Sequence, residues 1–491
     1  MSSSGHVIRK LISHSAIYWF AIMISKMIGF LLIPLYTRYL EPADYGVLEM
    51  LVLTVDVLSL VLGLQLIHAV ARYHDAAETA EEKQRVISTS IIIVATLAIF
   101  FYVSLSFIAD KVSLLIFDNT DFTYLFQTVF ITSIFSVITQ IPLLYIRIQD
   151  RSRLFVVITL TQVLLTVCLT VWMVVFLEMS IFGVLLANAI VSGGVCLVLL
   201  YWTMKSVGVR YDAAVAKEMV VYSAPLIPGV IGLFILNSSD RFFLNEMTSL
   251  VEVGLYAIGY KFGFLISPLL IGPFLLVWSA KMFEVYRHPE RDEVLNKVLT
   301  GLGFMLVFFA LSLSIFIDEI LQVMTPPQYH AAAVVVPIIA FAYVMNGLAR
   351  VMATPLYAEK KTGVIGYIHS SAAVICLLLN YIFIQMYGII GAAVATLLSF
   401  SYVFIAMFVM SQRLSTVRWD WFGIVKLIFI SMIFLGFGEV FSFESLLLNL
   451  TYKIILVAVF ILALVAVGFV SKRDIKAIIT MFLQRKVKKT S

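Results

Sequence analysis

Residues 154–177 read LFVVITLTQVLLTVCLTVWMVVFL and contain no charged side chain. A run of about 20 apolar residues is long enough for a helix to cross the hydrocarbon core of a bilayer, so this segment predicts a transmembrane helix. Runs of this kind recur about fourteen times along the chain. The predicted spans are residues 15–38, 45–70, 87–109, 122–145, 154–177, 181–203, 219–245, 252–278, 298–317, 331–357, 363–386, 388–411, 422–441 and 447–470.

The composition of the whole chain is that of an integral membrane protein. Apolar residues make up 62% of the 491 residues and charged residues 13%, whereas a soluble domain is typically about 45–50% apolar and about 25% charged. This contrast excludes an ordinary cytosolic protein. The predicted loops are too short to hold a folded soluble domain. We therefore expect an all-α integral membrane protein that acts inside the membrane or at its two faces.

Lysine and arginine are concentrated in every second predicted loop. All but seven of the 34 Lys and Arg residues fall on one side of the predicted membrane. Because Lys- and Arg-rich loops stay in the cytoplasm, that side is predicted to be cytoplasmic, with both termini inside. Residues 472–491 combine apolar residues at helical spacing with a basic face, so this tail is predicted to lie on the anionic inner leaflet. Docking of a partner protein is the alternative for the tail.

Two pairs of glycines recur at the same distance in the sequence. Gly46 and Gly254 open the predicted second and eighth spans, Gly183 and Gly391 open the sixth and twelfth, and both pairs are 208 residues apart. A shared offset predicts the duplication of a six-helix unit. Because six is an even number, both units begin on the same side of the membrane. They are therefore predicted to be related by a pseudo-twofold axis along the membrane normal, as in transporters built from parallel repeats.

The duplication predicts how the chain is organised. The predicted parts are an N-lobe of six helices (1–204), a cytoplasmic linker (205–218), a C-lobe of six helices (219–411), a helix hairpin (422–470) and a basic cytoplasmic tail (472–491). Prolines at positions 268 and 273 predict a bend in the eighth span, which would be either a hinge or a static kink.

Three segments resemble signatures of a known family. They are Pro34-Leu-Tyr-Thr-Arg-Tyr-Leu-Glu-Pro-Ala-Asp-Tyr-Gly46, the pair Asp240-Arg241, and Glu252-Val-Gly-Leu-Tyr256. They resemble the polysaccharide-transport branch of the MOP superfamily, which holds the Wzx-type lipid-linked oligosaccharide flippases. The resemblance implies that an undecaprenyl-pyrophosphate-linked glycan, such as an O-antigen or exopolysaccharide repeat unit, is moved across a bacterial inner membrane. As partners it implies membrane lipids and polysaccharide polymerase or assembly proteins, and it implies no enzymatic activity.

Charged residues inside the predicted spans are the first candidates for function. An ionisable side chain at the centre of a transmembrane helix costs roughly 2.5–3.5 kcal/mol, so such residues face a wet cavity, pair with each other or reach the interface. Lys26 lies near the middle of the first span and is predicted to face a central cavity, with a structural ion pair as the alternative. Asp56 lies at a similar depth in the second span. It is predicted to be the charge partner of Lys26 or a site of H⁺ or Na⁺ coupling.

Four further charged residues complete the candidate set. Lys261 is predicted to face the cavity, with tight helix packing as the alternative reading of its flanking glycines. Arg350 is also assigned to the cavity, although its side chain could instead reach the membrane interface. Arg241 is predicted to contact substrate or to anchor the helix at the interface. Asp240 is a candidate for ion coupling or charge pairing, but adjacent helical side chains do not face each other, so a simple pair with Arg241 is not expected.

Cations outnumber carboxylates among these candidates, with Lys26, Arg241, Lys261 and Arg350 against Asp56 and Asp240. Such a cationic cavity would suit a pyrophosphate. Two rival functions stay open. A cation-coupled multidrug antiporter of the related MATE branch would favour carboxylates instead. A membrane glycosyl or acyl transferase would need an acid and a base in a loop, where only Asp118 and Asp121 are candidates. The sequence contains no ATP-binding P-loop motif and no metal-binding motif, and no cofactor is predicted apart from H⁺ or Na⁺ coupling.

Overall fold

The computed structural model describes residues 23–441 and 445–467. All regular secondary structure in those residues is helical, and twelve of the helices are long and apolar enough to cross a membrane. The predicted count of about fourteen spans is therefore not confirmed. One of the twelve is a helix of 53 residues that is interrupted at Gly388 (φ 53°, ψ −128°). The predicted first span begins outside the described residues, and the predicted basic tail at 472–491 lies wholly outside them.

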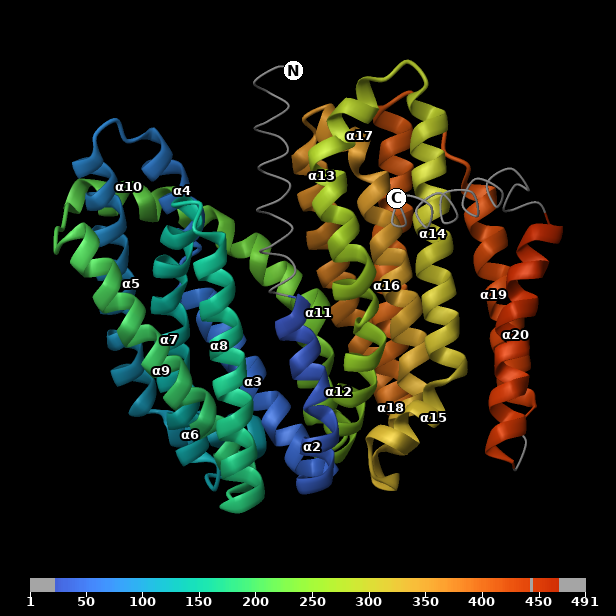
Figure 1. Cartoon of the computed structure of the whole chain (residues 1–491), viewed down its shortest axis with the longest axis horizontal. Helices are drawn as coiled ribbons and strands as arrows, with labels where there is room; N and C mark the ends of the chain where they lie inside the picture. Colours follow the sequence, from blue (N-terminus) through green and yellow to red (C-terminus); the bar gives the residue numbers. More distant parts are fainter. Residues whose placement is uncertain (1–22, 442–444, 468–491) are drawn as a thin grey trace, which may run out of the picture.

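The helices fall into two groups that stand side by side in Figure 1. The first group, coloured blue to green, is the N-lobe. It consists of α2 (Ile33–Tyr39), α3 (Pro42–Leu62), α4 (Leu66–Ala76), α5 (Ala80–Ser106), α6 (Ala109–Phe117), α7 (Thr123–Ile148), α8 (Ser152–Val171) and α9 (Ser180–Val207).

The second group, coloured green to orange, is the C-lobe, and the C-terminal hairpin lies at its far edge (Figure 1). The C-lobe consists of α11 (Ile227–Met247), α12 (Leu250–Phe264), α13 (Gly272–Arg287), α14 (Arg291–Ile315), α15 (Ile317–Met324), α16 (Val335–Met352), α17 (Thr354–Ala358) and α18 (Thr362–Leu414). The hairpin consists of α19 (Trp421–Val440) and α20 (Leu446–Ala466). The connecting helix α10 (Ala213–Ser223) packs against α4 and α5 of the N-lobe. The exact domain boundaries stay a prediction.

Two of the predicted spans are broken in the structure. The predicted span at 45–70 is divided into α3 and α4, because Leu64 and Gln65 take positive φ values of 44° and 53°. The bend predicted near Pro268 is present as a π-helical turn, Ser267–Ile271, between α12 and α13. Proline lacks an amide donor, so a helix that contains it loses a backbone hydrogen bond and bends there.

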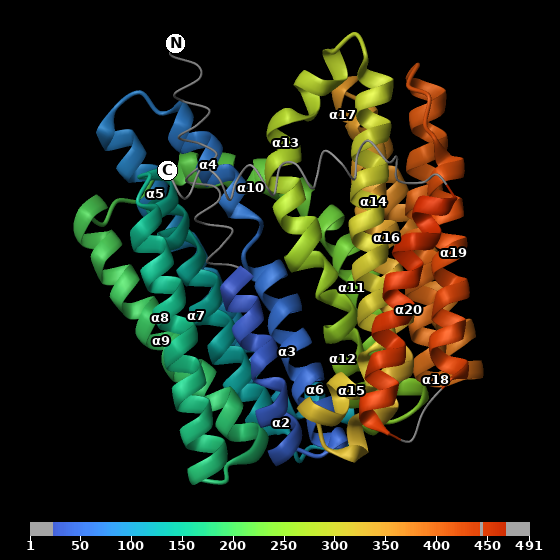
Figure 2. The same cartoon turned by 45° about the vertical axis from the view of Figure 1, so that its right-hand side comes forward.

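The two lobes converge at one end of the molecule and diverge towards the other. Helices α3 and α12 lie close together near α2, and they separate towards the opposite end, where α4 and α13 lie (Figures 1 and 2). We call these the α2 end and the α10 end of the molecule. Helix α3 starts at the α2 end with a capping box formed by Glu41 and Asp44 and with Pro42 in its first turn, so the start of the helix is well defined.

The contact between α3 and α12 at the α2 end is reciprocal. A Cβ atom added to Gly46 would lie 2.0 Å from the backbone oxygen of Leu250, and one added to Gly254 would lie 1.9 Å from the backbone oxygen of Pro42. Leu250 follows Pro42 by the same 208 residues that separate the two glycines. In a twofold contact each residue meets the equivalent of its own partner. This is the relationship that the sequence repeat predicts, and only glycine fits at either position.

Candidate functional site

Four charged side chains from three helices meet between the two lobes. Glu49 lies on α3, Asp240 and Arg241 lie on α11, and Lys261 lies on α12. The Nζ atom of Lys261 is 2.9 Å from Oε2 of Glu49, and Nη1 of Arg241 is 2.9 Å from Oδ1 of Asp240. The Nε atom of Arg241 lies 3.9 Å from Oε1 of Glu49, which connects the two pairs. We call these four residues the inter-lobe charge cluster.

Most of the cluster is withdrawn from solvent. Glu49, Asp240 and Arg241 are 7%, 2% and 4% exposed, whereas the side chain of Lys261 is 40% exposed. Removing ions from water is costly, and the cost is offset only where opposite charges and hydrogen bonds compensate it. The cluster meets this requirement by pairing, and Lys261 is the member that stays accessible.

Tyrosine side chains contact both cations of the cluster. Lys261 donates a hydrogen bond of 2.8 Å to the hydroxyl of Tyr45, which lies one turn before Glu49 on α3. The guanidinium of Arg241 stacks over the ring of Tyr260 at 3.8 Å from its centroid. Cation–π contacts of this kind are favourable when the cation is desolvated. Both cations are therefore held in fixed positions.

The glycine contact at the α2 end places the cluster. Glu49 follows Gly46 by three residues on α3, and Lys261 follows Gly254 by seven residues on α12, so each charge lies on about the same helix face as its glycine. Because the two backbones touch at the glycines, the charged side chains one or two turns further along can reach each other. The cluster is therefore built by the same repeat that builds the lobes.

The glycines that flank Lys261 allow close helix packing, which is the alternative that the sequence left open. A Cβ atom on Gly259 would lie 2.6 Å from the backbone oxygen of Ala332, and one on Gly263 would lie 2.7 Å from a side-chain carbon of Ile339. Both glycines thus allow α12 to pack closely, Gly259 against the segment that leads into α16 and Gly263 against α16 itself. Their small size is explained by helix packing and not by space around the ammonium group.

The expectation that Asp240 and Arg241 do not form a simple pair is wrong. Their Cα atoms are adjacent on α11, and the backbone does direct the two side chains apart. The long side chain of Arg241 nevertheless turns back along its own helix, where it also donates to the backbone oxygen of Asn237 at 2.8 Å. A flexible arginine can therefore reach the neighbouring carboxylate in spite of the helical geometry.

Lys26 and Asp56 lie outside the inter-lobe charge cluster. Asp56 is on α3, seven residues after Glu49 and on about the same face of the helix, and its side chain is exposed. Lys26 is also exposed and is close enough to Asp56 to interact with it electrostatically. The structure thus brings together the two residues that the sequence suggested as partners. Their role in transport stays a prediction.

Arg350 is not brought into the cluster. It lies on α16, inside the C-lobe, and lines a small cavity together with Asn346, Tyr357 and His369. These neighbours come from α16, α17 and α18, so Arg350 contacts helices of its own lobe. Its assignment to a central cavity therefore gains no support from its position, and it stays a prediction.

Sequence reasoning missed Glu49 and Tyr45. Glu49 lies seven residues inside α3, in a predominantly apolar segment, and that position could have marked it as a candidate. With Glu49 included, the cluster holds two cations and two carboxylates, not an excess of cations. Within the residues that the structure describes, no group of three or more His, Cys, Asp or Glu side chains is placed to hold a metal ion.

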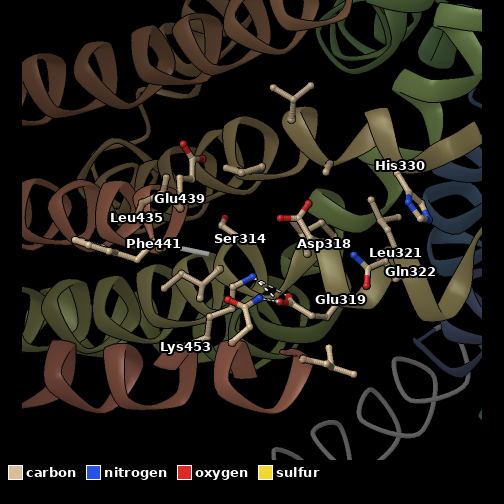
Figure 3. Close-up of a pocket in the computed structure, with 18 of the residues that line it drawn as sticks. Ser314, Asp318, Glu319, Leu321, Gln322, His330, Leu435, Glu439, Phe441 and Lys453 are labelled. Atoms are coloured by element: carbon tan, nitrogen blue, oxygen red, sulfur yellow. Dashed lines mark hydrogen bonds and ion pairs between the residues drawn. The ribbon is translucent and has the colours of Figure 1, made fainter. Parts of the chain in front are cut away.

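A separate ion pair attaches the C-terminal hairpin to the C-lobe. Lys453 on α20 lies 2.6 Å from Oε1 of Glu319 on α15, and Asn449 donates to the same oxygen at 2.7 Å. This pair borders a cavity of about 910 Å³ that Asp318 and Glu439 also line (Figure 3). The cavity lies between the hairpin and the C-lobe, away from the inter-lobe charge cluster.

The family described as "Polysaccharide biosynthesis protein" matches residues 11–279, which is more than half of the chain. The chain belongs to the polysaccharide biosynthesis protein family. The resemblance to the polysaccharide-transport branch of the MOP superfamily, noted in its sequence, is therefore confirmed, and so is the all-helical transporter fold.

Individual relatives of this family member are distant. The probable low-salt glycan biosynthesis flippase Agl15 of Haloferax volcanii is 24% identical over 192 residues, and the match covers 38% of this chain and 40% of Agl15. Among solved structures, the lipid II flippase MurJ in an inward closed conformation has a TM-score of 0.73 at 13% identity, with 90% of this chain and 97% of that chain covered. The Vibrio cholerae MATE transporter VcmN has a TM-score of 0.60 at 13% identity, with 84% and 98% covered.

These comparisons bear on the transferase alternative, but the shared fold does not distinguish a flippase from a MATE-type antiporter. The proteins named above are flippases and transporters, so they agree with the prediction of no enzymatic activity and give the transferase alternative no support. At 13% identity the two solved structures show a shared fold only, and that fold is common to flippases and MATE transporters.

Proposed function

We propose that this protein is a flippase that moves an undecaprenyl-pyrophosphate-linked oligosaccharide from the cytoplasmic to the outer leaflet by alternating access. The Lys- and Arg-rich α10 end faces the cytoplasm, as do both termini, and the α2 end faces outward. Membership of the polysaccharide biosynthesis family and the flippase named among its relatives support this substrate class.

The observation that carries the proposal is the inter-lobe charge cluster. It joins α3 of one lobe to α11 and α12 of the other, directly beside the glycine contact at the α2 end. Rocking of the two lobes has to separate Glu49 from Lys261 and Arg241. The pairing therefore acts as an outer gate that is closed in this structure.

The charge cluster also suggests how substrate drives the gate. Breaking a buried ion pair by removing one partner typically costs about 3–5 kcal/mol, because a charge is left uncompensated. A pyrophosphate group supplies anionic oxygens that form charge-assisted hydrogen bonds with lysine and arginine. Substrate that replaces Glu49 at Lys261 and Arg241 would offset this cost and favour opening. Lys26, Asp56, Asp240 and Arg350 are proposed to guide the headgroup or to couple its movement to H⁺ or Na⁺.

Reconstituted vesicles test the proposal. Purified protein in proteoliposomes should accelerate the transfer of a fluorescent undecaprenyl-pyrophosphate oligosaccharide between leaflets, read by its loss to a membrane-impermeant quencher. Vesicles without protein give the background rate. A rate equal to this background, together with Na⁺- or H⁺-driven exchange of an organic cation, would overturn the flippase proposal in favour of the MATE-type antiporter, whose fold the chain also shares.

A further inference from the structure

An apolar groove lies between α8 and α9, and the preceding argument gives it no role. It has a volume of about 870 Å³ and is lined from Leu154 to Leu169 on α8, by Trp172 in the π-helical turn after α8, and from Ile190 to Trp202 on α9. Where both helices line the groove, the lining on α9 spans 13 residues, and the 12 steps from Ile190 to Trp202 correspond to about 18 Å at 1.5 Å per residue. One leaflet of the hydrocarbon core is about 15 Å thick. The groove shared by both helices therefore matches one leaflet in depth.

Gly194 keeps this groove open. It lies on α9 among the lining residues, and a Cβ atom added to it would meet no other atom within 4 Å. The adjacent Gly193 is different, because its Cβ would come within 2.9 Å of the ring of Phe135 inside the lobe. Packing of the lobe thus explains Gly193 but not Gly194. A larger side chain at 194 would fill the groove without disturbing the lobe.

On both helices, the row of residues that lines the groove leads to a cation at the α10 end. Arg151 precedes Leu154 by three residues on one side, and Lys205 follows Trp202 by three residues on the other, so each continues its lining face. Both side chains are exposed, and among the described residues neither forms an ion pair. The guanidinium of Arg151 lies 5.4 Å from the centroid of the Trp202 ring.

No lining residue of the groove is charged. On α9 the lining ends at Ile190, and Glu178 lies 12 residues away in the turn at the α2 end, outside the lining. The groove therefore has apolar walls and two cations at its α10 end only. Such a surface complements a molecule with a hydrocarbon chain and one anionic head.

We propose that the α8–α9 groove binds an acyl chain of an anionic glycerophospholipid from the leaflet at the α10 end, with its phosphate between Arg151 and Lys205. Apolar burial along the groove holds the chain, and charge-assisted hydrogen bonds from the two cations select the head. Trp202 lies at the head level, where aromatic side chains are favoured in membrane proteins. The depth of the shared groove fits an acyl chain of one leaflet better than it fits the much longer undecaprenyl chain. This lipid site is independent of the flippase proposal.

Fluorescence quenching by brominated lipids tests the site. The protein is reconstituted in nanodiscs that contain increasing fractions of dibrominated phosphatidylglycerol or dibrominated phosphatidylcholine. Quenching that is present in the wild type and absent in a Trp202→Phe variant comes from Trp202, and it reports occupancy of the groove. We expect half-quenching of Trp202 at a much lower fraction of phosphatidylglycerol than of phosphatidylcholine. With about 1 kcal/mol per basic residue at the surface, R151Q/K205Q should raise the required phosphatidylglycerol fraction by about 30-fold.

Matched variants separate the site from general attraction to the membrane. R413Q/K361Q removes two exposed cations from the same end of the molecule but away from the groove, and it should leave the quenching curve unchanged. Gly194→Leu should weaken quenching by both lipids, whereas Gly301→Leu, at an equally open glycine on α14, should not. Conservative R151K/K205R should keep the preference for phosphatidylglycerol.

Three outcomes would overturn the proposal. Equal quenching curves for the two lipids, or an unchanged curve for R151Q/K205Q, would show that the groove does not select an anionic head. Displacement of brominated phosphatidylglycerol by undecaprenyl phosphate at less than equimolar amounts would assign the groove to the polyprenyl carrier instead. Flipping activity enters neither measurement, so the result does not depend on what the protein transports.

Discussion

The ammonium of Lys261 on α12 lies 2.9 Å from the carboxylate of Glu49 on α3, and this pair joins the two lobes next to the reciprocal glycine contact of Gly46 and Gly254. The two residues are 212 positions apart in the chain. They are not equivalent in the repeat, since 208 residues separate equivalent positions. The duplication supplies the close contact between lobes, and divergence of the two copies supplies the opposite charges.

Glu49→Gln should weaken the closed gate. The change leaves Lys261 and Arg241 without their shared carboxylate, but the cost should fall below the ~3–5 kcal/mol of a fully buried pair, because Lys261 is 40% exposed. Spin labels at the exposed positions Tyr39 and Val251 should show a longer distance between the lobes. Lys281→Gln breaks an exposed pair within α13 and serves as the control. A wild-type distance distribution in Glu49→Gln would contradict the gate.

Gly46→Ala should prevent closure at the α2 end. The new Cβ atom would lie 2.0 Å from a backbone oxygen of Leu250, and a backbone atom cannot move aside as a flexible side chain can. The same spin-label distance should increase, and transport should fall. Gly301→Ala adds a methyl group in open space and should leave both readouts unchanged. The prediction fails if Gly46→Ala keeps the closed distance.

Lys26→Ala and Lys261→Ala should each reduce the flipping rate while membrane insertion stays normal. Both side chains are exposed positive groups in or near apolar helices, where an anionic headgroup would meet them. If Asp56 couples transport to protons, Asp56→Asn should also remove the effect of collapsing the proton gradient. The flipping rate in vesicles measures all three variants. Wild-type rates in both lysine variants would argue against a cationic pathway.

The membrane-spanning helices and the repeat could be predicted because their signals are local or periodic. The apolar run at 154–177 needs no knowledge of its neighbours, and the structure places the long apolar segment Ser152–Phe176 there. The offset of 208 residues between Gly46 and Gly254 predicted a twofold relationship, which appears as their reciprocal contact. The first inference rests on one segment alone, and the second rests on the comparison of two similar segments.

The pairing of charges could not be predicted in the same way. Glu49 meets Lys261 only because α3 and α12 pack across the lobe boundary, and sequence spacing does not state which side chains share that boundary. Arg350 shows the reverse case, since it looked equivalent to Lys261 in the sequence but lies within one lobe. The depth of a charge in a helix is readable from the sequence, whereas the direction it faces depends on tertiary packing.

Asp212 should make the start of α10 sensitive to acid. Hydrogen bonds from the backbone amide of Val215 and then of Ala214, together with Arg85, hold the pKa of Asp212 below its usual value, although partial burial opposes them. A lowered pKa in the folded state means that the stabilisation is complete above the usual value of about 3.9. It is lost as the pH falls through the lower folded value.

Hydrogen exchange in the first turn of α10, corrected for intrinsic rates, measures this effect. Protection in the wild type should fall as the pH is lowered below about 4. Asp212→Asn should keep a helix cap, because asparagine also accepts from the backbone amides, but it should lose the dependence on pH. An equally steep pH dependence in Asp212→Asn would assign the effect to another group.

Lys453→Met should loosen the C-terminal hairpin. The side chains of Lys453 and Glu319 are only 6% and 12% exposed. After the substitution, the carboxylate of Glu319 stays largely buried and keeps Asn449 as its hydrogen-bond donor. Docking of the hairpin onto α15 should weaken by about 3–5 kcal/mol, the usual cost of breaking a buried pair. Faster hydrogen exchange along α20 measures the loss, because this helix meets the C-lobe beside the pair (Figure 3).

Two further variants decide whether the charge itself is responsible. Adding Glu319→Gln to Lys453→Met removes the unpaired carboxylate, so most of the lost protection should return. Lys297→Met breaks an exposed pair with Glu293 and should change protection little, since exposed pairs contribute about 0–1 kcal/mol. If the double variant exchanges as fast as Lys453→Met alone, the unpaired carboxylate of Glu319 is not what loosens the hairpin.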